Sequence, residues 1–356
     1  MTFSKTLIAA TLMVGTALTP ILSDTSWACS RLVHTSKNGD QVVTARSMDW
    51  FEDIKTNLWA FPAGLKRDGA VGKGSATWTS KYGSVIASGF DSGTADGLNT
   101  AGLVANMLYL AETDFGPRDP KRPGVSWSMF TQYLLDNFAT VAEAVADVQK
   151  KNIQVVASPL PGSVQKPPSL HFSISDATGD SAIFQWINGK LVVYHNPTYA
   201  VMTNSPTFDK QLALNGYWES VGGDAMLPGT RRAADRFVRA SYYLKQLPDP
   251  KTTQQAMANA MSVIRNVSVP FGEGDPQNPN ISTTIWRTAA DQKQRVYYFE
   301  STLSPNLIWV SLDKLNLKPG GAVQKLSLAD DPADGFLTGE MSGHFKPTPP
   351  FVFTGP

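Results

Sequence analysis

The stretch Ser26-Trp27-Ala28-Cys29 ends in the only cysteine of this 356-residue chain. The residues before it carry an early Lys5, an apolar run over residues 7–22, and small side chains at positions minus three and minus one to the cysteine. This order is typical of a secretory signal peptide. The run is interrupted and shorter than the roughly 20 apolar residues that a membrane-spanning helix needs. We therefore predict that residues 1–28 are a cleaved signal peptide; the alternative is an uncleaved anchor.

Cleavage after Ala28 would make Cys29 the first residue of the mature chain, with a thiol and a free α-amino group on one residue. An α-amino group has an unperturbed pKa of about 7.7 to 8.0, so part of it is a neutral base near pH 7. Such a base can take the thiol proton, and a thiolate is the attacking species in acyl transfer. The pattern predicts a catalytic nucleophile at Cys29. The alternatives are an ordinary buried thiol and the lipid-modified first residue of a lipoprotein.

Composition and charge argue against several other functions. The formal net charge is +1, which predicts no basic surface for nucleic acid or for an anionic membrane. The four histidines lack metal-ligand spacing and no second cysteine is present, so we predict no metal site. The sequence has neither a nucleophile elbow nor a complete phosphate loop.

The length suits one domain over residues 29–356. The Pro-rich end, about residues 345–356, cannot form a helix or a central strand. It predicts an arm that lies on the surface, either as a plain tail or against a neighbouring subunit.

Directly after Cys29 the sequence predicts a β-hairpin. Residues 30–35 and 41–48 are β-prone, and Asn38-Gly39 between them favours a tight turn. The second strand would return beside the new N-terminus and bring Arg46 and Asp49 to the level of Cys29. A cation beside a thiol favours the thiolate, and a carboxylate can orient an amine. The alternative is an exposed ion pair, which would contribute little to stability.

The remaining elements alternate between sheet and helix pairs. Strands are predicted at residues 57–62, 75–80, 83–89, 104–110, 170–175, 181–187, 190–195, 199–203, 282–289, 295–300 and 306–312, with residues 96–103 as a turn. Helices are predicted at residues 125–138, 230–247 and 252–267, and after a capping box formed by Thr140 and Glu143. This order predicts a layered α+β domain in which helices face two antiparallel sheets.

Two further polar residues have a plain and a functional interpretation. Asn204 follows a predicted strand, where its amide could stabilise the oxyanion of a tetrahedral intermediate. Asparagine before Ser-Pro is also a common turn residue. Arg236 lies near the start of a predicted helix. Its local sequence alone predicts a solvated charge on the helix surface.

Five motifs together resemble the choloylglycine hydrolases, a family of bile salt hydrolases and penicillin V acylases. They are Cys29 at a processed N-terminus, Ala45-Arg46-Ser47-Met48-Asp49, Asp96-Gly97-Leu98-Asn99 with Gly102-Leu103, Thr203-Asn204-Ser205-Pro206-Thr207-Phe208-Asp209, and Leu227-Pro228-Gly229 with Arg236-Phe237. The similarity runs over nearly all of the mature chain. It implies the four-layer αββα fold of the N-terminal nucleophile hydrolases.

The resemblance also implies a role for each site residue. Cys29 would be the nucleophile and, through its amine, the base. Arg46 would support the thiolate, Asp49 would hold the amine, and Arg236 would complete the charged cluster. Asn204 and the backbone N–H of Tyr109 would form the oxyanion hole. The reaction would be hydrolysis of a linear amide through a thioester, without a cofactor.

Substrate and setting are also expectations. Trp50, Phe51, Tyr109 and Leu110 could line an apolar acyl pocket, or they could be core residues. The resemblance places conjugated bile salts first, with penicillin V and acyl homoserine lactones as alternatives; Tyr109 resembles the acylases. The leader, and the short interval between Asn204 and Arg236, resemble those of the Gram-negative members of the family.

We therefore expect a periplasmic enzyme that acts on a small-molecule amide. It would bind no nucleic acid and carry no stable membrane anchor. A homo-oligomer, either a dimer or a tetramer, is a possible assembly. The alternative from another class is an exported or lipid-anchored binding protein on the same fold.

Overall fold

The computed structural model describes residues 29–150, 152–159, 161–162, 169–223, 225–272, 282–304, 306–328 and 337–356. The predicted signal peptide, residues 1–28, lies outside the described residues.

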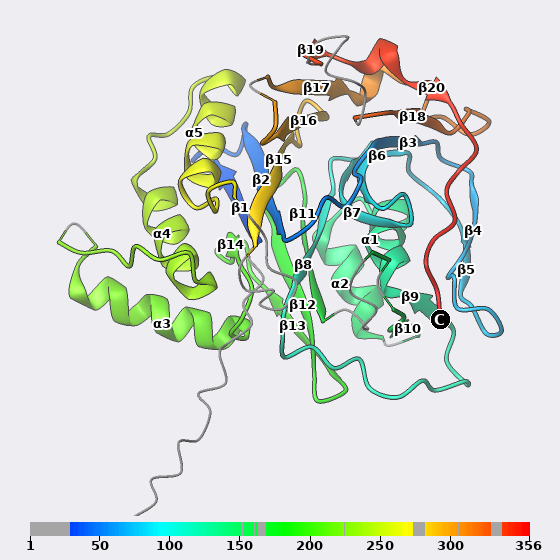
Figure 1. Cartoon of the computed structure of the whole chain (residues 1–356), viewed down its shortest axis with the longest axis horizontal. Helices are drawn as coiled ribbons and strands as arrows, with labels where there is room; N and C mark the ends of the chain where they lie inside the picture. The colour runs from blue at the N-terminus through cyan, green and yellow to red at the C-terminus, as the bar shows by residue number, and fades with distance from the viewer. Residues whose placement is uncertain are drawn as a thin grey trace, which may run out of the picture.

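Two large sheets form the centre of the molecule (Figure 1). The nine-stranded sheet runs, in spatial order, through β13 (Lys190–His195), β12 (Ser181–Ile187), β11 (Leu170–Ser175), β8 (Val104–Tyr109), β7 (Gly93–Asn99), β6 (Ser84–Gly89), β3 (Leu58–Phe61), β18 (Gln324–Leu326) and β20 (Lys346–Pro347). The seven-stranded sheet runs through β14 (Val201–Met202), β1 (Ser30–Thr35), β2 (Val42–Trp50), β15 (Thr283–Asp291), β16 (Val296–Ser301), β17 (Ile308–Ser311) and β19 (Gly339–Glu340). All pairs in these two sheets are antiparallel except β17 with β19.

Helices cover the outer face of each sheet. The helices α1 (Trp127–Asn137) and α2 (Val141–Gln149) contact the nine-stranded sheet, and α4 (Ala233–Gln246) and α5 (Thr253–Asn266) contact the seven-stranded sheet (Figure 1). The inner faces of the sheets meet, because β2 contacts β8. This is the predicted four-layer αββα arrangement, in which each sheet buries both faces. The short pairs β4 (Lys66–Asp68) with β5 (Thr77–Thr79) and β9 (Gly124–Ser126) with β10 (Gln154–Val156) lie outside the two sheets.

The hairpin after Cys29 has the predicted form. Its strands pair in register from Ser30 opposite Ser47 to Thr35 opposite Val42. Gly39 adopts a φ of 74°, in the left-handed region that glycine tolerates best. Because side chains alternate along a strand, one face of β2 carries Arg46, Met48 and Trp50 toward the other sheet. The opposite face carries Asp49.

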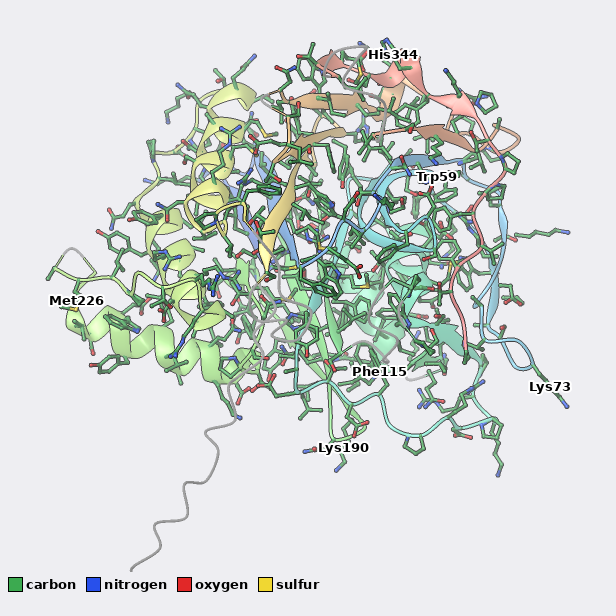
Figure 2. All side chains as sticks on the ribbon, viewed as in Figure 1. Trp59, Lys73, Phe115, Lys190, Met226 and His344 are labelled. Carbon is green, nitrogen blue, oxygen red and sulfur yellow. The ribbon has the colours of Figure 1, made fainter. Side chains whose placement is uncertain are left out.

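Most of the other predicted elements are confirmed to within a few residues, one prediction is wrong, and several elements were not predicted. Residues 96–99 belong to β7, and the turn is confined to residues 100–102. Helix α3 (Phe208–Val221) was not predicted at all. Only two of its residues are buried, Phe208 and Gln211, so the sequence has no continuous apolar face to indicate a helix. Its exposed side points away from the body of the molecule, and Met226, just beyond its end, lies at the outer edge (Figure 2).

The Pro-rich end lies at the edge of the nine-stranded sheet. Its first residues make β20, the edge strand of the nine-stranded sheet, which is a position that proline allows. The chain then runs along the outside of the sheet past β3 toward β9 (Figure 1).

Candidate active site

Cys29 lies immediately before β1 and is 2% exposed. Its backbone nitrogen donates to Asn204 Oδ1 at 2.6 Å. Its Sγ lies 3.8 Å from the Arg46 guanidinium and 3.7 Å from the carbonyl oxygen of Asp49. Burial raises the pKa of this thiol above its ordinary value and outweighs the lowering effect of Arg46. The resting side chain is therefore a thiol, and attack needs a base that removes its proton.

Arg46 is fully buried and joins the two sheets. Its guanidinium donates to Ala95 O at 2.9 Å and to Met107 O at 2.8 Å, both on the nine-stranded sheet. Its charge lies 3.7 Å from the Asp96 carboxylate. The Trp286 ring lies 4.8 Å from the guanidinium carbon, in cation–π geometry. These contacts hold a fixed positive charge beside Cys29 Sγ, as the sequence predicted.

Asp49 is the buried carboxylate of the site. Its Oδ1 accepts a hydrogen bond from Thr284 Oγ1 at 2.5 Å. Its Oδ2 has no hydrogen-bond partner among the described residues and lies 3.9 Å from the Arg236 guanidinium. Burial raises the pKa of this carboxyl to about 6, against the lowering effect of Arg236. An unfilled buried acceptor is costly, and an ammonium group on Cys29 is the kind of donor that would fill it.

Arg236, in the first turn of α4, is fully buried and is not the solvated charge that its surroundings in the sequence suggest. Its guanidinium donates to Cys29 O at 2.7 Å, to Asn204 Oδ1 at 2.8 Å and to Ser30 Oγ. It thus holds the backbone of the nucleophile, whereas Arg46 lies beside the sulfur.

Asn204 and Tyr109 meet at one edge of the site. Asn204 Nδ2 donates to Tyr109 O at 2.7 Å. Leu110 N donates to Ser169 O at 2.9 Å, so in the β8–β11 ladder the N–H and C=O of Tyr109 face the other way, toward Asn204. A side-chain amide and a backbone N–H therefore share one edge beside Cys29. Two such donors are what an oxyanion hole requires.

An apolar cavity opens onto Cys29. It is lined by Cys29, Arg46, Met48, Trp50, Ile54, Gly89, Phe90, Gly93, Ala95, Met107, Tyr109, Trp127 and Leu170. Apart from the nucleophile and Arg46, the side chains are hydrocarbon, thioether or aromatic. This is the form of a site that binds an apolar acyl group.

Two of the four predicted pocket residues line this cavity and two do not. Trp50 and Tyr109 line it. Phe51 stacks on Trp50 with ring centroids 5.4 Å apart but faces a different cavity. Leu110 is completely buried and lines neither cavity. Trp50 lines both cavities, whereas Phe51 lines only the second one.

Sequence reasoning missed several lining residues. Met48 and Met107 follow from strand alternation, since Met48 lies between Arg46 and Trp50 on the same face of β2. Trp127 and Phe90 come from α1 and from the turn after β6, and no local pattern indicates that these segments meet.

Within the described ranges, no cluster of histidine, cysteine and acidic residues has the geometry to hold a metal ion. In the same part of the chain, no helix has the length and apolar character required to cross a bilayer.

Two antiparallel sheets between helix layers, with a cysteine immediately before the first strand, define the class of N-terminal nucleophile hydrolases. The family model of linear amide C–N hydrolases, choloylglycine hydrolase family, matches residues 29–330. The chain belongs to this family and is a linear amide C–N hydrolase.

Relatives within the family differ in their similarity to the chain. Penicillin V acylase of Pectobacterium atrosepticum is 49% identical over 94% of each chain. The solved structure of penicillin V acylase from Agrobacterium tumefaciens is 51% identical, with a TM-score of 0.84, and covers 92% of this chain and 100% of its own. Bile salt hydrolase/transferase of Lactiplantibacillus plantarum is 24% identical over 62% of this chain and 74% of its own.

Proposed function

We propose that the mature chain begins at Cys29 and cleaves an amide that carries a compact aromatic acyl group, such as the phenoxyacetyl group of penicillin V. The observation that carries the proposal is the apolar cavity directly beside Cys29 Sγ, with Trp50, Tyr109 and Trp127 in its wall. A phenoxyacetyl group is flat and apolar and suits such a wall. The two relatives near 50% identity are both penicillin V acylases.

In the proposed mechanism the α-amino group of Cys29 takes the thiol proton as Sγ attacks the carbonyl carbon. Asn204 Nδ2 turns from Tyr109 O to the developing oxyanion, and the Tyr109 N–H donates to the same oxygen. The C–N bond then breaks, and the proton passes from the terminal ammonium to the leaving amine. A water molecule attacks the thioester, gives up its proton to the same amine, and releases the acid and the free thiol. Asp49 and Arg236 hold the amine and the backbone of Cys29 through both steps.

Conjugated bile salts, which the sequence resemblance ranked first, become the second candidate. The bile salt hydrolase relative is only 24% identical, and Tyr109 in the cavity wall favours the acylases. Acyl homoserine lactones are a third candidate, since an acyl chain is also apolar.

One panel of substrates tests the assignment. The purified mature protein is incubated with penicillin V, penicillin G, glycocholate and a long-chain acyl homoserine lactone, and the released amine is measured. The proposal expects the highest kcat/KM for penicillin V. A higher kcat/KM for glycocholate would overturn the choice of acyl group, and inactivity toward all four would remove the substrate assignment altogether.

Export to the periplasm of a Gram-negative bacterium is part of the proposal. The residue pattern of positions 1–28 supports it, and so does the start of the family match at Cys29. Cell fractionation with N-terminal sequencing tests it: the mature protein is expected in the periplasm with Cys29 first. A possible dimer or tetramer, without a membrane anchor, stays a prediction that light scattering of the exported protein can check.

A further inference from the structure

The last six residues of the chain, 351–356, are here called the C-terminal strap. They follow the edge strand β20 and lie beyond residues 29–330, the part that matches the family model. The strap makes three sets of contacts: with the nine-stranded sheet, with two segments next to the apolar cavity, and with the loop between β4 and β5.

The first set is aromatic. Phe351 packs edge-on against Trp59 and Phe61 of β3, with ring centroids 5.1 and 5.7 Å apart. Phe353 packs on Phe351 at 4.7 Å. Trp59 lies on the sheet beside the C-terminal segment (Figure 2). Such ring pairs contribute roughly 0.5 to 1.5 kcal/mol each beyond the burial of their area, so this part fastens the strap to the sheet.

The second set is polar and lies at Thr354. Its backbone nitrogen donates to Ser92 O at 2.8 Å. Its carbonyl oxygen accepts from Ser126 Oγ at 2.5 Å and from Ser128 Oγ at 2.6 Å. Ser126 is the N-cap of α1 and Ser128 lies in its first turn. One residue of the strap thus joins the turn after β6 to the start of α1.

The third set is steric and lies at Gly355. A Cβ atom built on Gly355 would lie 1.8 Å from Ala70 O. The strap therefore passes so close to the backbone that no side chain fits, and only glycine permits the contact.

The two segments that Thr354 joins both form the cavity wall. Ser92 precedes Gly93, and Trp127 stands between the two serines; Gly93 and Trp127 line the cavity beside Cys29. The segments also touch one another, since a Cβ built on Gly93 would lie 3.2 Å from Ser128 Cβ. The position of this wall is therefore coupled to the strap.

We infer that the C-terminal strap is a positioning element of the acyl site, which fixes the wall formed by Gly93 and Trp127 and so sets the acyl selectivity of the enzyme. The inference rests on the proposed function, in that the acyl group enters this cavity. The strap touches neither Cys29 nor its charged partners in the described contacts, so it should alter acyl binding and leave the reactivity of the thiol unchanged.

The sharpest test is the single substitution Gly355→Ala, which adds one methyl group at the close contact. Its matched control is Gly343→Ala, in the same C-terminal segment, where a Cβ would meet nothing within 4 Å. Ser128→Ala, which removes one donor to Thr354 O, is the milder second variant in case Gly355→Ala does not fold. Circular dichroism confirms the fold of each variant before measurement.

The readout does not need the natural substrate. Cys29 is alkylated with iodoacetamide and with 2-iodo-N-phenylacetamide; in both, Sγ bonds to the methylene carbon, iodide leaves, and the thiol proton passes to the base. We expect Gly355→Ala to lower the rate with the phenyl reagent at least about fivefold, because the wall no longer holds the ring. The rate with iodoacetamide should stay within about twofold, and Gly343→Ala should match the wild type with both reagents.

Kinetics give the second readout. Gly355→Ala and Ser128→Ala should each raise KM for penicillin V and reduce the preference for penicillin V over penicillin G. The kcat of each variant should stay within about twofold of the wild-type value. Unchanged alkylation ratios in a folded Gly355→Ala protein and in Ser128→Ala would overturn the inference. If the wild type cleaves neither penicillin, the proposed function fails, while the alkylation ratios still decide the role of the strap.

Discussion

The environment of the Cys29 nucleophile and the acyl cavity beside it are built in opposite ways. Around Cys29, buried charges and amides have directed partners at fixed distances, contributed by Arg46, Asp49, Asn204 and Arg236. The cavity wall is apolar and comes from segments spread between Met48 and Leu170. Strand β2 serves both, because Arg46, Met48 and Trp50 alternate with Asp49. Under the proposed function, the charged cluster carries out the reaction and the cavity selects the acyl group, so we expect that each can be changed separately.

The largest effect is expected at the nucleophile. Cys29→Ala should lower kcat by at least about 10⁴-fold, since no other described group is placed to attack the carbonyl. The melting temperature should stay close to that of the wild type, because a small side chain is exchanged for a slightly smaller one. Steady-state kinetics and calorimetry measure both quantities, and retained turnover would refute the assignment.

The second effect is expected in the oxyanion hole. Asn204→Ala should lower kcat about 10²- to 10³-fold, as the loss of one oxyanion donor does in other hydrolases. KM should change much less, because the cavity wall is untouched. If KM rises tenfold while kcat is unchanged, Asn204 belongs to substrate binding instead.

The third prediction concerns Asp49 and compares two forms of the protein. One is the mature form that begins at Cys29, and the other retains a residue before Cys29. The pKa of Asp49 in the folded protein, about 6, lies above the usual value near 3.9. The folded state therefore binds the proton more tightly than the unfolded state does. As a result, the free energy of unfolding falls as pH rises from about 4 to about 6. With a residue still attached before Cys29, Asp49→Asn should therefore add stability at pH 7, by at most about 3 kcal/mol, and add none below pH 4.

In the mature form the terminal ammonium should pair with Asp49, and this gain should shrink or reverse. Chemical denaturation of both forms at pH 4 and pH 7 measures the difference. An equal gain at pH 7 in the two forms would show that the amine does not lie at Asp49.

The smallest effect is expected in the cavity, where two leucines form a matched pair. Leu170 lines the cavity and Leu110 does not, although both are buried. Leu170→Ala should raise KM for the acyl substrate about 3- to 10-fold with little change in kcat, whereas Leu110→Ala should leave KM within about twofold. Both should lose roughly 2 to 5 kcal/mol of stability. Equal KM changes in the two variants would mean that the cavity is not the acyl site.

The same contrast explains what could be predicted from the sequence. The hairpin after Cys29 is local, and the Asn38-Gly39 turn with two β-prone runs was sufficient to place Arg46 and Asp49. Arg236 lies 207 residues from Cys29 in the chain, and its helix pattern alone gave the wrong environment; only the family resemblance brought it to the site. Its burial follows from long-range hydrogen bonds that no local pattern encodes.

The cavity was the least predictable part. Phe51 and Leu110 were assigned to it by their closeness to Trp50 and Tyr109 in sequence, but Phe51 lines only the neighbouring cavity and Leu110 lines neither. Trp127 and Phe90 reach the cavity only through tertiary packing, and the C-terminal strap contacts the segments that form its wall. Helix α3 was missed because its exposed leucines break the apolar periodicity.

The most direct test of the account is the mass of the N-terminal peptide of the active, exported enzyme, which identifies the first residue and any group attached to it. Protein mixed with penicillin V and quenched in acid is digested, and its N-terminal peptide is analysed by mass spectrometry. The account predicts Cys29 as the first residue with a free α-amine, and one phenoxyacetyl group on its sulfur in the quenched sample. Full activity in protein that retains residue 28, or that carries an acyl group on the α-nitrogen, would contradict it.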